Sequence, residues 1–395
     1  MNRVLSIATL YPNAATPRFG TFVARSLETL AARRDWQVTV INPIGVPPIA
    51  FGKYRPLAAA AVGGTVHGVE IHRPRFTLIP RLGVRFNPAI IARTILPLVR
   101  RLHAQAPFSL VDAQFFYPDG PVAARIARAL GLPLTIKARG SDINYWGGQL
   151  HAARQMLSAA DQASGLLAVS GSLADEMARL GMDRSKITIH YTGLDRERFR
   201  PLAHSGLRAR LSAELGVTLP ETLPVLASVG NLIEHKGQGL VIEALAQLPR
   251  AHLMLVGTGD DEPRLRALVQ QTGTSERVHF LGSLDHDLMP LVLNAADAMV
   301  LPTAGEGLAN AWVEALACGT PLVTTDVGGV RELMRAPEAG VLVSRSVPAI
   351  VAGITQVVSQ AAPRDLVAAS VEHFDWHHHA AALADHYSRI AARIS

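Results

Sequence analysis

The sequence has a single cysteine, Cys318, among its 395 residues, which excludes an internal disulfide and a metal cluster held by cysteines. Long apolar runs are also absent. The most apolar stretch, residues 89–99, carries Arg93 in its middle and is far shorter than the ~20 residues that a membrane-spanning helix needs. The apolar run at residues 4–10 is at the short limit for a secretory signal and precedes Tyr-Pro-Asn in place of a cleavage site. We therefore expect a first β-strand there and a cytoplasmic protein.

Acidic residues are scarce in the first half of the chain. Residues 1–200 hold 12 acidic and 25 basic side chains, a net charge of +13, whereas the remainder holds 20 and 13, a net charge of −7. This asymmetry indicates an anionic partner for the first half, with nucleic acid, anionic lipid and a phosphorylated substrate as candidates. The alternative is that arginines, 34 against four lysines, are spread over a solvated surface. The 49% hydrophobic and 18% charged composition is that of a globular protein of two or three domains.

Short apolar strands alternate with helical stretches in both halves, a pattern typical of parallel α/β sheets covered on both faces. The sequence therefore predicts two Rossmann-like domains, with the division near Arg200 and Pro201. The last segment is helical in pattern and has no strand after it, so it need not belong to the domain it follows. The predicted strands are 4–9, 37–41, 110–114, 134–138, 166–169 and 187–191 in the first half, and 224–229, 252–256, 277–281, 298–302, 321–325 and 340–343 in the second.

The segment 302–329 predicts a ligand site in the second half. A strand ends at Pro302, a loop follows, and the helix predicted over 309–317 is apolar nearly all round, which is typical of a buried helix. Asn310 and Glu314 interrupt the apolar pattern at i, i+4 spacing, and Glu306 lies one turn upstream on the same stripe. Because a buried carboxylate is costly without partners, the stripe must contact something polar. A bound ligand is favoured at the carboxyl end of a parallel strand, with an internal ion pair as the alternative.

A second site is predicted after the strand that ends near Gly230. Lys236 and Gly237 precede the next helix, a position suited to a phosphate held by a lysine and backbone amides. A solvated surface lysine is the alternative. The segment is not a Walker loop, because Gly237 follows the lysine where that motif has Ser or Thr. The run at residues 257–262 is not a dinucleotide fingerprint either, because Glu262 occupies the third glycine position, which counts against a dehydrogenase.

These motifs carry a resemblance to a known family. EGLANAWVEALACGTPLVTTDVGGVRE at 306–332 resembles the Glu-x7-Glu segment of the retaining glycosyltransferases with the GT-B fold, family 4 in the sequence classification. VGNLIEHKG at 229–237 is similar to that family's strand-loop-Lys-Gly element, and residues 186–201 to its end-of-first-domain signature. Residues 374–387 resemble its closing helix, which crosses back onto the first domain. The resemblance covers nearly the whole chain and implies an acceptor domain of residues 1–199 with helix 376–395, and a donor domain of residues 200–375.

The resemblance also implies roles for individual residues. Glu314 would accept hydrogen bonds from the ribose hydroxyls, and Glu306 would hold the donor sugar together with the amides that follow it. Lys236 would neutralise the leaving diphosphate, and the backbone at His279 and Phe280 would line the base. The implied donor set is Gly20, Gly230, Asn231, Lys236, His279, Phe280, Glu306, Gly307, Leu308, Ala309, Asn310 and Glu314.

Several positions depart from the family's pattern. Asn231 stands where an arginine is common, and Arg139 stands where a first-domain histidine commonly contacts the donor sugar. An arginine there suits a carboxylate or a phosphate, which admits a uronic-acid donor or a lipid-phosphate acceptor. The catalytic candidates are Glu306, Lys236 and Arg139. The acceptor-side candidates are Arg139, Asp142 and Arg18.

The expected function is retaining transfer of a sugar from a UDP- or GDP-linked donor to a saccharide or lipid-linked acceptor, in bacterial surface polysaccharide or glycolipid synthesis. The resemblance implies no metal, because Lys236 and helix amides supply the charge stabilisation, and it implies no other cofactor. Nucleic acid becomes an unfavoured partner. A sugar-nucleotide epimerase of the same fold and a catalytically silent binding or scaffold subunit remain as alternatives, the latter because of Asn231.

Two further segments carry weaker predictions. Residues 81–103 mix arginines, among them Arg81, with large apolar side chains, the composition of an interfacial helix that would place the protein at the inner face of an anionic membrane. An ordinary surface helix is the alternative, because two prolines interrupt the segment. Histidines 377–379 suggest a metal site, but consecutive helical residues point in different directions, so a solvated helix start is favoured.

Overall fold

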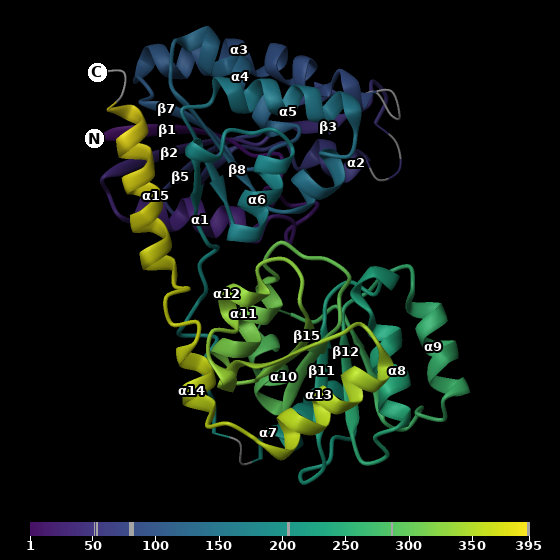
Figure 1. Cartoon of the computed structure of the whole chain (residues 1–395). Helices are drawn as coiled ribbons and strands as arrows, with labels where there is room; N and C mark the ends of the chain where they lie inside the picture. The colour runs from purple at the N-terminus through teal and green to yellow at the C-terminus, as the bar shows by residue number, and fades with distance from the viewer. Residues whose placement is uncertain (51, 53, 79–82, 204–205, 286, 393–395) are drawn as a thin grey trace. The chain divides into compact units, whose positions relative to one another are not determined.

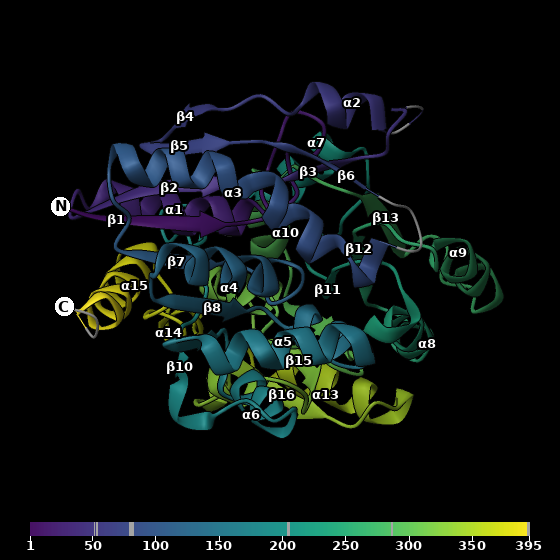
Figure 2. The ribbon, with the colours of Figure 1, turned by 90° about the horizontal axis from the view of Figure 1, so that it is seen from above.

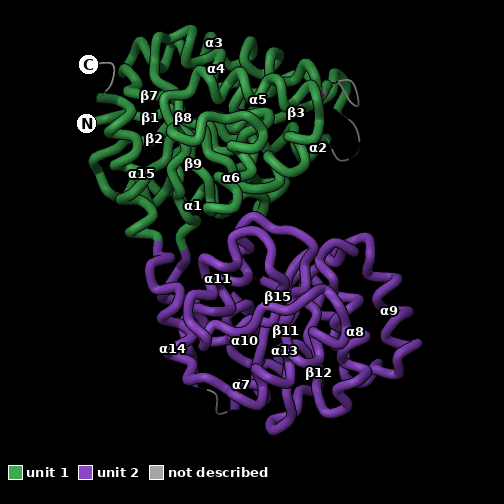
Figure 3. Tube along the Cα trace, in the orientation of Figure 1, with its two compact units in different colours: residues 1–193, 376–395 green, residues 194–375 purple. Residues whose placement is uncertain are grey.

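The computed structural model describes the chain except residues 51, 53, 79–82, 204–205, 286 and 393–395. The chain divides into two compact units, one of Met1–Gly193 with Trp376–Ser395 and one of Leu194–Asp375 (Figure 3). The first division thus lies six residues before the position expected from the sequence. Each unit is a parallel α/β structure, which confirms the predicted Rossmann-like fold.

Unit 1 is built on an eight-stranded sheet in the order β10-β9-β8-β7-β1-β2-β5-β4, in which β4 alone runs antiparallel to its neighbour. The strands β7, β8 and β9 are buried at every residue, as continuous apolar runs require when both faces are covered. The chain order reverses between the neighbours β1 and β7, which makes the carboxyl ends of these strands a topological switch point. The strands are β1 (Asn2–Ile7), β2 (Trp36–Ile41), β4 (Gly64–Val66), β5 (Val69–His72), β7 (Leu110–Ala113), β8 (Leu134–Ala138), β9 (Gly165–Ala168) and β10 (Ile187–Ile189), with β3 (Ile44–Val46) and β6 (Arg75–Thr77) in a separate pair.

Helices cover both faces of this sheet. The helices α3, α4 and α5 lie side by side on one face, as Figure 2 shows, and α1 packs with α15 on the other (Figure 1). Val4 points to the α1 side and Leu5 to the α3 side, as alternation along a strand demands. The helices are α1 (Thr21–Ala32), α2 (Tyr54–Ala59), α3 (Asn87–Gln105), α4 (Asp119–Leu130), α5 (Leu150–Gln162), α6 (Gly171–Arg179) and α15 (Trp376–Ala391), with short turns η1 (Gly83–Arg85), η2 (Asp142–Trp146) and η3 (Arg184–Lys186).

The C-terminal helix α15 docks on unit 1 through buried polar contacts. His379 is hydrogen-bonded to Ser26 Oγ (2.6 Å) and to the Tyr191 carbonyl (2.7 Å), and His386 to Thr135 Oγ1 (2.9 Å). His190 lies beside His379, with the ring centroids 4.2 Å apart. His379 is 5% exposed, so the prediction of a solvated helix start is wrong for this residue. Among the described residues, no cluster of side chains suited to holding a metal ion is found.

The apolar side of α3 is part of the unit 1 core. Ile91, Ile95 and Val99 are buried, and α3 packs against α4. Most of the apolar side chains of the predicted interfacial helix are therefore covered by protein, which favours the alternative of an ordinary surface helix, whereas Phe86 before its first residue is 53% exposed. Arg81, which was part of that prediction, lies outside the described residues. In the part of the chain that the structure describes, no helix combines the length and the apolar character that crossing a bilayer requires.

Unit 2 is built on a six-stranded parallel sheet in the order β13-β12-β11-β14-β15-β16. Its switch point lies between β11 and β14, where the chain reverses its direction of travel across the sheet. The helices α8, α9 and α13 cover one face, and α7, α10, α11 and α14 group together apart from them. The strands are β11 (Val225–Val229), β12 (His252–Val256), β13 (Val278–Gly282), β14 (Ala298–Leu301), β15 (Leu322–Thr325) and β16 (Gly340–Val343). The helices are α7 (Leu207–Leu215), α8 (Gln238–Ala246), α9 (Glu262–Gln271), α10 (Met289–Ala295), α11 (Asn310–Ala317), α12 (Val330–Leu333), α13 (Val347–Ser359) and α14 (Arg364–Ala369), with turns η4 (Glu234–Lys236) and η5 (Pro337–Ala339).

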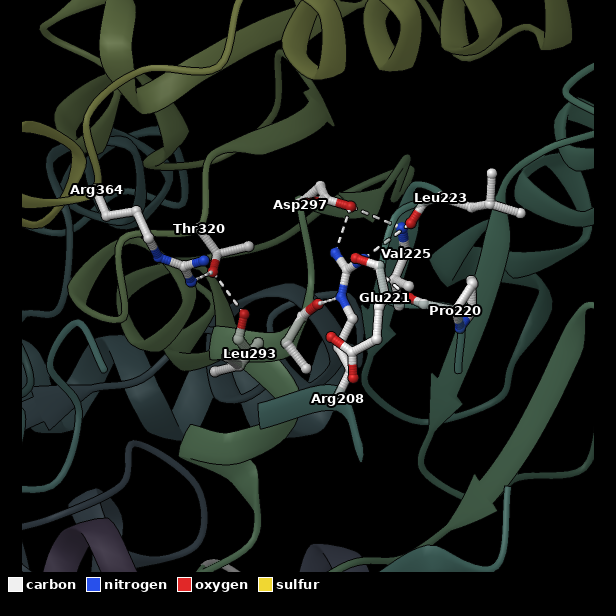
Figure 4. A network of polar contacts seen from close by, with 10 residues as sticks. Arg208, Pro220, Glu221, Leu223, Val225, Leu293, Asp297, Thr320 and Arg364 are labelled. Atoms are coloured by element: carbon white, nitrogen blue, oxygen red, sulfur yellow. Dashed lines mark hydrogen bonds and ion pairs between the residues drawn. The ribbon is translucent and has the colours of Figure 1, made fainter. Parts of the chain in front are cut away.

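A buried arginine fastens the start of unit 2 to the amino edge of its sheet (Figure 4). Arg208 on α7 is 4% exposed and donates to the carbonyl oxygens of Pro220, Glu221 and Leu223 and to Asp297 Oδ2 (2.7 Å). The same Asp297 oxygen accepts the Val225 N–H (2.8 Å) at the start of β11. A cavity of about 380 Å³ lies at this amino edge, so it does not coincide with the site predicted at the carboxyl edge.

Candidate active site

Two loops at the switch point of unit 2 bring the principal predicted residues into contact. Lys236 lies in the loop after β11 and Glu306 in the loop after β14, and the Lys236 Nζ forms an ion pair with Glu306 Oε1. The two side chains are 19% and 15% exposed. Burial lowers the pKa of Lys236 from its usual value. The alternative of a solvated surface lysine is therefore wrong, whereas the alternative of an internal ion pair is present at Glu306, and the structure joins two motifs that lie 70 residues apart.

Backbone contacts hold these two loops together. The Ala304 N–H donates to the His235 carbonyl (2.8 Å), and the His235 ring is hydrogen-bonded to the Gly305 carbonyl (2.7 Å). Gly237 has a φ of +79°, and a Cβ there would lie 2.4 Å from the Pro302 carbonyl oxygen. Glycine after the lysine is thus required both by the left-handed conformation and by the close approach of the β14 loop.

A third loop, which follows β15, supports the Glu306 segment from the other side. The Gly329 N–H donates to the Gly307 carbonyl (2.6 Å). Gly328 has a φ of +58°, and a Cβ there would lie 2.0 Å from the Glu306 carbonyl oxygen. No role is predicted for these glycines from the sequence, although a Gly-Gly pair at the end of the segment 302–329 is a signal of close backbone approach.

The helix α11 begins at Asn310, directly after the loop that carries Glu306. Trp312, Val313 and Leu316 are buried, which confirms the predicted buried helix, and Asn310 is exposed. Glu314 is partly exposed, and burial raises its pKa to about 7, while the Arg198 guanidinium acts in the opposite direction. The amides of Gly307, Leu308 and Ala309 precede the helix, where no side chain caps it. Such free amides and the helix dipole favour anionic or polar ligands.

The side chains of the predicted base-lining residues His279 and Phe280 both contact neighbouring side chains of unit 2. His279 stacks on His252 with ring centroids 5.7 Å apart, and His252 is the first residue of β12. The His279 side chain is therefore held toward the amino half of the sheet, and the Phe280 ring is covered by Arg266 at 4.2 Å. A bulge follows, and Gly282 carries the strand to the carboxyl edge, where its carbonyl accepts the Gly257 N–H (2.8 Å). Gly282 lies two residues beyond Phe280, and its backbone is at the carboxyl edge of the sheet, while the predicted contact of a base with the backbone at His279 and Phe280 stays a prediction.

Gly230 and Asn231 begin the loop that ends in Lys236. Gly230 has a φ of +151°, and its carbonyl oxygen would lie 2.0 Å from a Cβ added at Gly257. The Asn231 side chain is exposed, and its carbonyl accepts Gln238 Nε2 (3.1 Å) at the start of α8. The loop backbone therefore approaches the end of β12 and is hydrogen-bonded to the start of α8.

In unit 1, the predicted residues lie after β1 and β8. Gly20 has a φ of +77° and precedes α1, and a Cβ there would lie 2.6 Å from the Leu10 carbonyl group. Arg18 is exposed in the same loop. Arg139 directly follows β8, and its guanidinium donates from Nε to the Gln114 carbonyl (2.8 Å) and from Nη2 to Gln114 Oε1 (2.5 Å).

Asp142 is unsuited to the acceptor-side role expected of it. Its carboxylate is fully buried and accepts the backbone N–H groups of Phe116 (2.8 Å), Arg139 (3.0 Å) and Gly140 (2.9 Å). Burial raises its pKa, and these hydrogen bonds oppose that shift. The structure therefore assigns Asp142 to holding the turn after β8, and we withdraw it from the acceptor-side set.

Both halves of the chain match known glycosyltransferase families. Residues 20–198 match Glycosyltransferase Family 4, and residues 216–370 match Glycosyl transferases group 1. A D-inositol 3-phosphate glycosyltransferase of Catenulispora acidiphila is 30% identical over 376 residues, which cover 88% of this chain and 85% of the relative. With the two Rossmann-like units, these matches show that the chain belongs to the GT-B glycosyltransferases of the family 4 type, enzymes of glycan biosynthesis.

Further relatives extend over nearly the full length. TuaC of Bacillus subtilis, a putative teichuronic acid biosynthesis glycosyltransferase, is 27% identical over 365 residues, which cover 90% of this chain and 88% of TuaC. Among solved structures, Anabaena HepE in complex with UDP is similar with a TM-score of 0.75 at 21% identity, covering 98% of this chain and 100% of HepE. Sucrose-phosphate synthase of Thermosynechococcus elongatus is similar with a TM-score of 0.78 at 19% identity, covering all of both chains.

Proposed function

We propose that this glycosyltransferase transfers a sugar from a UDP-linked donor to a saccharide or lipid-linked acceptor, with retention of the anomeric configuration. The ion pair of Lys236 and Glu306 at the unit 2 switch point carries the proposal, because it places a cation for the diphosphate beside a carboxylate for the sugar hydroxyls. The choice of UDP is supported by HepE, a structural neighbour that was crystallised with UDP and with UDP-glucose.

Each group has a distinct part in the proposed reaction. Lys236 and the amides before α11 stabilise the negative charge that develops on the departing diphosphate, so no divalent metal is required. Glu306 orients the donor sugar, Glu314 accepts hydrogen bonds from the ribose, and the Gly282 backbone lines the base. The departing phosphate oxygen helps to deprotonate the acceptor hydroxyl, on the same face of the sugar that it leaves.

The nucleotide is tested first. In a thermal-shift comparison of UDP, GDP and ADP, we expect UDP to raise the melting temperature most, since a ligand at a hundred times its Kd adds about 2.7 kcal/mol of stability.

The transfer reaction is tested second. Release of UDP from UDP-sugars should depend on added acceptor, persist in EDTA and fall in Glu306→Gln. Exposed Glu276 provides the matched control, Glu276→Gln. Acceptor-independent conversion of the donor would contradict transfer, and an inverted linkage in the product, read by NMR coupling constants, would contradict retention.

The acceptor class rests on the relatives and on the charge of the first half. TuaC is named for teichuronic acid biosynthesis, and LpsE of Rhizobium meliloti, 40% identical over 124 residues, for lipopolysaccharide core biosynthesis. We propose a bacterial surface polysaccharide or glycolipid as the product, made at the cytoplasmic face of the membrane.

Exposed apolar and basic side chains of unit 1 are available for peripheral contact with that membrane. They are Phe86, 53% exposed with Arg85 5.7 Å from its ring, and Leu150, 62% exposed. Co-sedimentation with vesicles should rise with phosphatidylglycerol content; indifference to this lipid would contradict the contact.

A further inference from the structure

Arg139 is held in one orientation by a chain of buried polar side chains. Gln114, 1% exposed, binds the guanidinium through both its carbonyl and its side-chain oxygen. The Gln114 amide is in turn fixed, because its Nε2 donates to Asp112 Oδ2 (2.5 Å), which also accepts the Ser6 hydroxyl (2.8 Å). The chain Ser6–Asp112–Gln114–Arg139 thus runs from β1 through β7 to the end of β8. Side chains locked by such partners present their remaining donors in a defined direction.

One nitrogen of the guanidinium has no hydrogen bond to the described residues. The Phe22 ring lies 4.9 Å from Arg139 Cζ and covers one side of it. Nη1 makes no hydrogen bond to any residue that the structure describes, and Arg139 is partly exposed. Two nitrogens are therefore committed to Gln114, and the third is positioned but unused.

Among the described residues, the positive charge of Arg139 has no direct ion-pair partner. Within the described ranges, no carboxylate oxygen lies within 4.0 Å of its guanidinium. Asp142 is committed to backbone N–H groups, and Asp112 to Gln114 and Ser6. Burial lowers the pKa of Arg139 to about 10, which still leaves it charged at neutral pH. Asp142 and Asp112 favour the charged form of Arg139 without bonding to its guanidinium, so an anionic ligand would be its direct partner.

We propose that Arg139, positioned by Gln114 and Asp112, binds an anionic oxygen group of a substrate, either a carboxylate or a phosphate. This inference rests on the proposed glycosyl transfer, since it names the chemical class of one of its two substrates. The carboxylate would belong to a uronic acid, and the phosphate to a phosphorylated acceptor. Gln114 and Asp112 are positioning residues, because they act through Arg139 and not on the ligand.

Paired ligands that differ only in charge test the proposal by calorimetry on the full chain. UDP-glucuronate is compared with UDP-glucose for the donor, and glucuronate and glucose 1-phosphate are each compared with glucose, in the presence of UDP, for the acceptor. We expect one anionic ligand to bind roughly tenfold to a hundredfold more tightly than its neutral counterpart, the range expected of a charge-assisted hydrogen bond. A preference in the donor pair assigns the anion to the donor, and a preference in an acceptor pair assigns it to the acceptor.

Variants separate the charge from its positioning. Arg139→Gln should abolish the preference, Arg139→Lys should retain part of it, and Gln114→Leu should reduce it through loss of orientation. Arg154→Gln, an exposed arginine of α5, is the matched control and should keep the preference. UDP affinity, measured for each variant, reports whether the protein is folded.

Two results would overturn the inference. One is a wild-type protein that binds no anionic ligand more tightly than its neutral counterpart. The other is an Arg139→Gln variant that loses affinity for UDP and for the anionic ligand alike. Failure of the proposed function is distinguishable from both, because then UDP itself would not bind and no donor would release UDP when acceptor is added.

Discussion

Lys236 and Glu306 form an ion pair between two loops that follow neighbouring strands of one sheet. The pair neutralises, in the unliganded protein, the two side chains whose charges the donor is proposed to engage. Donor binding therefore replaces the ion pair inside the protein with contacts to the ligand. Replacing one residue of the pair should change how the other residue binds the donor.

Glu306→Gln should separate nucleotide affinity from turnover. Loss of the carboxylate releases Lys236 for the diphosphate, so we expect UDP to bind roughly two- to fivefold more tightly by calorimetry, the range of a partly exposed ion pair. Turnover should fall about a hundredfold, because the sugar loses its orienting group. Glu276→Gln should change neither quantity. Weaker UDP binding in Glu306→Gln would contradict this prediction. It would show that Glu306 holds Lys236 in the position that binds the diphosphate and does not compete with the diphosphate for Lys236.

The ionisation of Glu314 should appear in the pH dependence of nucleotide binding. Its pKa of about 7 in the folded protein lies above the usual 4.5, so the carboxyl is largely protonated below pH 7 and ionised above it. Because the ionised form is the better acceptor for ribose hydroxyls, UDP affinity should rise about tenfold from pH 6 to pH 8. UDP itself also titrates in this range, and it does so equally with wild type and with Glu314→Gln. The difference between the two pH profiles therefore reports Glu314 alone. Identical pH profiles of the two proteins would show that Glu314 does not titrate in this range.

Gly328→Ala should impair activity more than stability. A Cβ at this position would lie 2.0 Å from the Glu306 carbonyl oxygen, so the β14 loop must shift. We expect turnover to fall by about tenfold or more, since sub-ångström misplacement at a reacting centre is costly. Gly273→Ala is the matched control, because Gly273 has a similar φ of +66° and open space around its Cβ position. Gly273→Ala should lose about 1 kcal/mol of unfolding free energy in denaturant titrations, the cost of the left-handed conformation, and Gly328→Ala should lose more because its Cβ also meets backbone atoms. Equal activities would exclude a role for the glycine pair in placing Glu306.

Docking of α15 should weaken in mild acid. Burial lowers the pKa values of His190 and His379 well below the usual 6.5, so the unfolded chain takes up protons before the folded one does. Stability is therefore full above pH 6.5 and falls as the pH drops below it, by up to about 1.4 kcal/mol per pH unit for each histidine. Hydrogen exchange of the α15 amides, corrected for intrinsic rates, should accelerate between pH 7 and pH 5.5. The variant His379→Gln should reduce this pH dependence. Exchange rates of the wild-type α15 amides that do not change with pH would contradict the prediction.

Arg208→Met should destabilise unit 2 strongly. The variant removes the arginine that donates to Asp297 and to four carbonyl groups, and breaking such a buried pair costs about 3 to 5 kcal/mol. Arg210→Met removes an exposed arginine of the same helix, whose ion pair with Glu214 is worth at most about 0.5 kcal/mol. Chemical denaturation measures both. If Arg208→Met and Arg210→Met lose the same unfolding free energy, the hydrogen-bond network of Arg208 contributes little net stability.

The alternation of apolar strands and helices was sufficient to predict the fold, because continuous apolar runs have few alternatives to a covered parallel sheet. All six strands predicted for the second half are present within two residues of their expected bounds. The short strands between Ile44 and Thr77 were missed, because three or four residues carry too little periodicity to be distinguished from turns. Asp142 was misjudged for a related reason: a carboxylate beside a glycine suits a ligand site and a backbone turn equally well.

The sequence by itself determined that this protein has two Rossmann-like units, and which loops of the second unit carry its polar groups. Those conclusions depend on local periodicity and on motif spacing, which the chain carries without reference to its neighbours. The tertiary structure alone decided which polar groups meet. The order of strands places β11 beside β14, so Lys236 reaches Glu306, and the order of β1, β7 and β8 links Ser6 to Arg139 through two intervening side chains. Such contacts depend on strand order and burial, and these are properties of the folded sheet rather than of any single segment.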